Sequence, residues 1–93
     1  MKVVFNIAEQ FSELTPANSD SFAEEMLKLE DSAIDEIVLD MKDISSVNSL
    51  SIGAIYAAYE RLKNEGRSLT IINPSDHVRK LMSTMGLADI FGD

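Results

Sequence analysis

The sequence contains no cysteine, no tryptophan and only one histidine, His77. Without cysteine, the chain has no disulfide, no thiol redox centre and no thiolate-bound metal, and a cytoplasmic location becomes the default expectation. A single histidine leaves few ligands for a transition metal. The sequence therefore predicts neither a metal site nor a cofactor, and burial of apolar side chains must supply the stability.

Long apolar runs are also missing. None approaches the roughly 20 residues that a helix needs to cross a bilayer. The first residues, Met1–Asn6, carry one positive charge and are not followed by the apolar stretch of a targeting signal. We therefore expect a cytoplasmic protein without membrane insertion.

Basic residues are scarce: eight Lys and Arg stand against sixteen Asp and Glu, giving a net charge of −8. A phosphate backbone would be repelled, so nucleic-acid binding is not expected. Residues 9–43 hold eleven acids and two bases, whereas residues 60–80 hold three acids and five bases. The acidic segment is either a solvated face that maintains solubility or a surface that attracts a basic protein partner.

Apolar and β-branched runs predict three strands, at residues 3–7, 36–41 and 69–73. Apolar side chains at helical spacing predict three helices, at about residues 17–30, 50–64 and 76–85. The unbroken run Ile37–Leu39 is typical of a strand buried on both faces of a parallel sheet. The β-α-β-α-β-α order predicts one α/β domain over residues 1–93, with right-handed crossovers.

The central helix is expected to pack on the sheet through apolar residues at Leu50, Ala54, Ala57 and Leu62. Gly53, one turn into this helix, suggests a close approach of the two backbones, and Gly66 is a natural left-handed cap at its end. Four methionines, Met26, Met41, Met82 and Met85, are expected to fill gaps in the core.

Motifs of catalysis are absent. No glycine-rich phosphate loop and no Gly-x-Ser-x-Gly elbow occur, and His77 is expected on the surface in the first turn of its helix. The carboxylates of Asp35, Glu36, Asp40 and Asp43 flank a buried strand without the spacing of a calcium loop. The sequence favours a binding protein over an enzyme.

The segment from Lys42 to Gly53 runs from the end of the strongest strand into the central helix, at the edge where parallel sheets bind ligands and partners. Capping by Asn48 or Ser49 explains only part of its polar content. Tyr56 and Tyr59 follow on one side of the helix, where they either cover the sheet edge or form a partner patch. The hydroxyl and amide residues of the segment are Ser45, Ser46, Asn48, Ser49 and Ser51.

These features together resemble a known family. The stretch 37–44, its continuation 47–53, the strand and turn 69–75 and the helix 78–87 are similar, in that order, to the STAS domains of bacterial anti-sigma factor antagonists. The resemblance covers roughly residues 36–91. It implies a mostly parallel sheet of four or five strands with helices packed around it, although the first third of the chain has room for only one clear strand.

The resemblance also implies a function in signal transduction and transcription regulation. Such proteins bind an anti-sigma factor that is a kinase-like protein, and phosphorylation of one serine in the loop breaks the complex, since a phosphate at an interface adds repulsion and desolvation. Two alternatives are a STAS subunit that binds the ATPase of a lipid transport assembly and a nucleotide or small-ligand binder. A homodimer is compatible with all three.

The usual family motif, Asp-Ser-Ser/Thr-Gly-x-Gly, is altered here. Alignment on Gly53 places Leu50 at the phosphate acceptor and Ser51 at the first glycine. Ser49 and Ser51 become the candidate phosphorylation sites, and constitutive binding becomes an equal alternative. The resemblance assigns partner binding to the loop and helix start, at Ser46, Asn48, Ser49, Leu50, Ser51, Gly53 and Tyr56.

Overall fold

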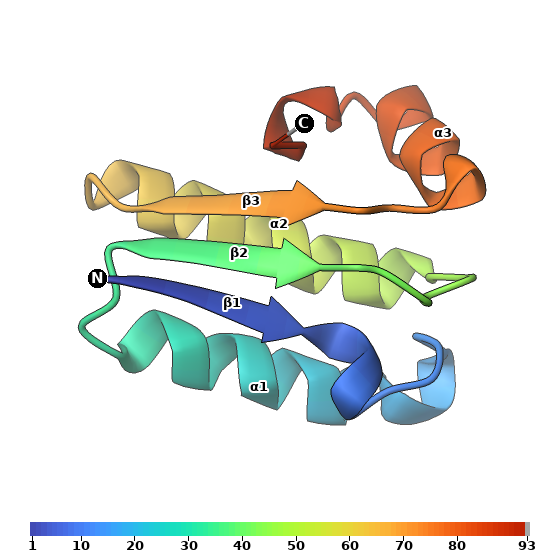
Figure 1. The fold of residues 1–93 in the computed structure, drawn as a ribbon, viewed down its shortest axis with the longest axis horizontal. Helices are drawn as coiled ribbons and strands as arrows, with labels where there is room; N and C mark the ends of the chain where they lie inside the picture. The colour runs from blue at the N-terminus through green and yellow to red at the C-terminus, as the bar shows by residue number, and fades with distance from the viewer. Residues whose placement is uncertain (93) are drawn as a thin grey trace.

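The computed structural model describes residues 1–92, in which strands and helices alternate along the chain (Figure 1). The strands are β1 (Lys2–Asn6), β2 (Glu36–Asp40) and β3 (Ser68–Ile72), and the helices are α1 (Ser19–Asp31), α2 (Ser49–Asn64) and α3 (Asp76–Thr84). Each predicted element is confirmed to within about two residues. Three short 3-10 helices complete the chain, η1 (Ile7–Glu9), η2 (Pro16–Asn18) and η3 (Ala88–Ile90).

The strands form one sheet in the order β1-β2-β3, and both pairings are parallel. The predicted sheet of four or five strands is wrong for the described residues, which form three. After β1 the chain turns at once into η1 instead of returning as a second strand. Beyond β3, the only further pairing among residues 1–92 is a parallel bridge between Phe91 and Ile71.

The central strand, β2, is buried on both faces, as its apolar run predicts: Ile37, Val38 and Leu39 are all buried. The neighbouring strands alternate, so that Leu69 and Ile71 are buried. Helices α1 and α2 pack against each other, and Figure 1 shows α2 passing behind the strands while α3 lies beyond the β3 edge. Because strand order follows chain order, right-handed crossovers place α1 and α2 on the same face of the sheet.

The inward face of α2 agrees with the prediction at Leu62, which is buried, and at Ala54, which packs against the core, but not at Leu50. Ile52, Ile55, Ala58 and Leu62 are buried, whereas Leu50 is 61% exposed. Spacings of three and four residues bring the two large isoleucines onto one stripe with Leu62, and this stripe buries more apolar area than one through small alanines. Ala54 and Ala57, the other two predicted contacts, lie on its flanks and are only partly buried.

The expected close approach at Gly53 is also wrong. A Cβ atom added there would meet nothing within 4 Å, so the glycine faces open space on the outer side of α2. Gly66 has φ of 76°, which confirms the left-handed cap after the helix. Met26, Met41 and Met82 are buried as predicted. Met85, the C-cap residue that follows α3, is instead 49% exposed.

Arg67 ties the end of α1 to the sheet. Its guanidinium donates to three backbone carbonyls, those of Ile34 (2.7 Å), Glu30 (2.9 Å) and Ser32 (2.9 Å). Glu30 lies in the last turn of α1, where helix carbonyls lack intrahelical partners. Ser32 and Ile34 lie in the turn that leads into β2. Within residues 1–92, no helix is long and apolar enough to span a membrane.

Candidate functional site

The carboxyl ends of β2 and β3 lie at the same edge of the sheet, on the right in Figure 1, and their loops lead into α2 and α3. Asp40, the last residue of β2, joins the two loops by accepting hydrogen bonds from the side chain of Asn73 (3.1 Å) and from the backbone of Lys42 (3.0 Å). Asp43 and Asn73 both adopt positive φ, at 69° and 55°. The loops are thereby held as turns beside the start of α2.

Asn48 is the residue that caps α2, one of the two candidates from the sequence. Its side-chain Oδ1 accepts from the backbone N–H of Ser51 (3.1 Å), and its own backbone N–H donates to Ser51 Oγ (3.1 Å). This reciprocal capping box satisfies two donors at the helix start. Ser51 is fully buried, and its hydroxyl also donates to the carbonyl of Asn48 (2.9 Å).

A second set of contacts, which we call the brace, fixes this helix start to the first residue of α1 and to the segment before it. Asn48 Nδ2 donates to Ser19 Oγ (3.0 Å), which in turn donates to the carbonyl of Thr15 (2.8 Å). Nearby, Ser46 Oγ donates to a carboxylate oxygen of Glu13 (3.2 Å). No local pattern predicts these partners, because they come from a segment that is distant in the chain.

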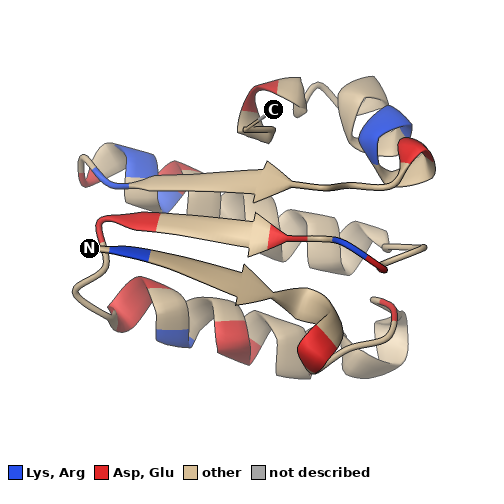
Figure 2. Ribbon diagram, in the orientation of Figure 1, with Lys and Arg blue, Asp and Glu red and all other residues tan. Residues whose placement is uncertain are grey.

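The outer side of the helix start is exposed and uncharged. Ser49, Leu50, Gly53 and Tyr56 lie within about a third of the helix circumference, since 3.6 residues make one turn. Ser49 and Gly53 are exposed, Leu50 is 61% exposed and Tyr56 41% exposed. No charged residue occurs from Ser49 to Tyr59, so this half of α2 is tan in Figure 2, whereas α1 carries several acids. We call Ser49, Leu50, Gly53 and Tyr56 the outer face of α2.

The geometry divides the predicted site residues into two groups. The first group forms the hydrogen bonds of the cap and the brace and consists of Ser46, Asn48 and Ser51. The other four residues form the outer face. Within residues 1–92, no three His, Cys, Asp or Glu side chains gather as a metal-binding group. The arrangement is an uncharged surface with an exposed leucine on a capped helix, which is suited to contact another macromolecule.

Comparison with protein families finds that residues 4–92 match the model of the STAS domain. The chain belongs to the STAS domain family. Comparison with curated proteins finds no match. The family assignment explains the parallel sheet and the capped helix after β2, which the sequence resemblance had predicted.

Solved structures of the same fold include anti-sigma factor antagonists. The antagonist SpoIIAA in its unphosphorylated form superposes with a TM-score of 0.79 at 22% identity, covering 99% of this chain and 78% of that one. SpoIIAA of Bacillus in the phosphorylated form gives 0.74 at 20% identity, with 99% and 81% covered. TM1081 of Thermotoga maritima, described as a putative anti-sigma factor antagonist, gives 0.81 at 20% identity, with 97% and 75% covered.

Proposed function

We propose that this STAS domain is a cytoplasmic, non-enzymatic regulatory module that binds a kinase-like anti-sigma factor through the outer face of α2. The observation that carries the proposal is the exposure of Leu50. A leucine that is 61% exposed at the start of a fixed helix is available to a partner without rearrangement of the core. The structural likeness to SpoIIAA, an anti-sigma factor antagonist, supports the class of partner.

Preorganisation favours binding at this surface. The capping box and the bond from Asn48 to Ser19 hold the backbone beneath Leu50 in one conformation. Little conformational entropy is then lost on binding, because the loop is already ordered. A large apolar side chain surrounded by uncharged residues also has a small desolvation penalty, which is a property of interface anchors.

We further propose that partner binding does not require dephosphorylation. Leu50 occupies the usual acceptor position and has no hydroxyl. Of the two neighbouring serines, Ser51 is fully buried with its hydroxyl engaged in the cap, whereas Ser49 is exposed. If a kinase does act on this site, Ser49 is the acceptor we propose, and a phosphate there would weaken the complex by adding charge to the outer face.

Affinity capture with the wild-type chain and two variants tests the proposal. Leu50→Asp introduces a charge on the outer face, and Leu27→Asp is the matched control because Leu27 is 50% exposed on α1. We expect wild type and Leu27→Asp to capture the same protein. Leu50→Asp should bind it at least about tenfold more weakly, as for a hot-spot residue.

Identification of the captured protein decides the function. A kinase-like anti-sigma factor supports the proposal, whereas recovery of a transporter ATPase establishes the alternative of a transport subunit. Equal capture by both variants would show that the partner docks elsewhere on the domain.

A further inference from the structure

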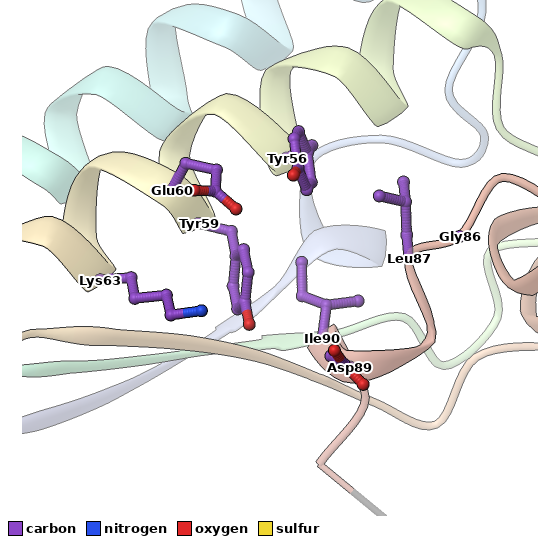
Figure 3. Close-up of a pocket in the computed structure, with 8 residues that line it drawn as sticks. All are labelled: Tyr56, Tyr59, Glu60, Lys63, Gly86, Leu87, Asp89 and Ile90. Carbon is purple, nitrogen blue, oxygen red and sulfur yellow. The ribbon is translucent and has the colours of Figure 1, made fainter.

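A groove lies between α2 and the turn that joins α3 to η3 (Figure 3). Its volume is about 90 Å³, the size of a side-chain head group rather than of a cofactor. One wall is the third and fourth turns of α2, and the other is the turn after α3 together with η3. The lining residues are Tyr56, Tyr59, Glu60, Lys63, Gly86, Leu87, Asp89 and Ile90.

Two tyrosine rings line the α2 wall of the groove. The ring centroids of Tyr56 and Tyr59 are 6.2 Å apart with an interplanar angle of 29°, so the two rings are stacked. Lys63 Nζ lies 5.8 Å from the centroid of the Tyr59 ring. The ring of Tyr59 thus already faces a cation from its own helix, as expected from the negative potential of an aromatic face.

The charges of the groove leave it acidic. Glu60 and Asp89 contribute two carboxylates against the single ammonium of Lys63, so the lining carries one net negative charge. A hydrogen bond to Glu60 is the main reason why the pKa of the Tyr56 phenol is raised above its usual value. The chain as a whole has a net charge of −8 and adds a long-range attraction for cations.

We propose that this groove receives an arginine side chain of the protein that docks on α2, an inference that rests on the proposed function. Tyr56 belongs to both surfaces, because it lines the groove and is also one of the exposed residues of the outer face of α2. One partner helix or loop can then place an apolar contact on Leu50 and a basic anchor between the tyrosines and the two carboxylates.

Arginine suits the groove better than other side chains. A planar guanidinium stacks on an aromatic ring and donates to carboxylates at the same time, whereas an ammonium does so only as a point charge. A leucine in the groove would desolvate the carboxylates of Glu60 and Asp89 without replacing their hydrogen bonds, which is unfavourable.

Small probes test the groove separately from the partner. Tyr56 and Tyr59 are the only tyrosines and the chain has no tryptophan, so the NMR signals of the tyrosine rings and tyrosine fluorescence report on this groove. We compare N-acetyl-arginine amide with N-acetyl-citrulline amide, which is nearly isosteric but uncharged, and with N-acetyl-leucine amide. The arginine probe is expected to shift both ring signals saturably and to bind at least about two- to fivefold more tightly than citrulline.

Charge variants identify the groups that hold the probe. Glu60→Gln is expected to weaken arginine binding about two- to fivefold and Tyr56→Leu to abolish the ring-specific shift. Glu24→Gln is the matched control, because Glu24 is exposed on α1 and lies on the side of that helix opposite the buried Phe22 and Met26. It should leave the affinity unchanged.

The outcomes separate this inference from the proposed function. Equal responses to arginine and citrulline, no response to arginine, or tighter binding of leucine would each overturn the arginine site, even if a partner is captured through Leu50. Saturable, charge-dependent arginine binding supports the site. If Leu50→Asp still captures the partner, the proposed docking face fails while the groove retains its measured specificity.

Discussion

Asn48 Nδ2 donates a hydrogen bond to Ser19 Oγ at 3.0 Å, linking the start of α2 to the start of α1 across 29 positions of the chain. The same Asn48 side chain caps α2 through Oδ1. One residue therefore fixes both the helix that carries the outer face and the segment that braces it.

Replacing Asn48 by Ala should lower the free energy of unfolding by about 1–2 kcal/mol, because the cap and the brace are both lost. Ser19→Ala should cost about 1 kcal/mol, since it removes only the brace. Urea denaturation of the two single variants and the double variant gives the coupling between the residues. Strictly additive losses would show that the bond contributes nothing.

Ser49 and Ser51 are expected to behave oppositely. Ser51→Ala should destabilise the fold by about 1 kcal/mol, because it leaves the backbone N–H of Asn48 without its partner. Ser49→Ala should change stability by less than about 0.5 kcal/mol, as for an exposed residue. Incubation with a cognate kinase and ATP, followed by mass spectrometry, should place any phosphate on Ser49; a folded protein phosphorylated on Ser51 would contradict this.

Gly53→Ala should stabilise the protein by about 0.4–1 kcal/mol. The site is helical and open, so alanine restricts the unfolded chain without a clash in the folded one. Gly66→Ala is the matched control, because φ of 76° at Gly66 is unfavourable for alanine and that variant should be less stable than wild type. The measurement is the denaturant midpoint; a destabilised Gly53→Ala would mean that the site is enclosed.

Two arginines that both contact the end of α1 should differ in importance. Arg67→Ala is expected to cost about 2–3 kcal/mol, because three carbonyls lose a charged donor on a side chain that is only 17% exposed. Arg61 forms a two-point ion pair with Glu30 at 2.6 and 2.7 Å but is 52% exposed. Arg61→Ala should therefore cost at most about 1 kcal/mol.

Salt separates the two arginines further. The Arg61 pair should weaken as sodium chloride is added, because the Arg61 side chain is 52% exposed and its charge is screened by salt. The contribution of Arg67 should persist for the most part, because three of its acceptors are neutral carbonyls and only Glu65, at 3.0 Å, is charged. A comparison of thermal midpoints at low and high salt measures both effects, and equal salt dependence for the two variants would contradict this account.

The pH dependence of Tyr56 gives an independent check on its bond to Glu60. The pKa of the phenol is raised above its ordinary value, first by this hydrogen bond and then by the charge of Glu60. The bond therefore contributes stability below the unfolded pKa of about 10 and loses it as the pH rises through the folded pKa. Spectrophotometric titration of Glu60→Gln should show Tyr56 ionising at lower pH than in wild type, while Glu24→Gln should not.

Local rules were sufficient for the secondary structure. Apolar runs located the three strands, helical spacing located the three helices, and Asn48 and Gly66 were recognised as end signals because capping depends on neighbouring residues only. The order of the elements fixed the parallel sheet for the same reason, since a crossover helix between strands leaves few topologies.

The side of α2 that faces the core was not decided by local rules. Leu50 and Ile52 are both apolar and lie two residues apart, so either can begin an inward stripe on pattern alone. Packing selects the stripe through Ile52 and Ile55, because it encloses more apolar area against α1 and the sheet. Leu50 and Gly53 are left outward for that reason, and the candidate docking surface follows from it.

The sequence by itself determined the fold family, the capped helix and the residues around it, because each depends on short-range pattern or on an ordered set of motifs. Only the tertiary structure decided that Ser51 is buried while Ser49 is exposed, that Ser19 bonds to Asn48, and that Asp89 and Tyr56 line one groove. Those relationships join residues far apart in the chain. Burial and hydrogen bonding between such residues arise only when the packed core brings their elements together.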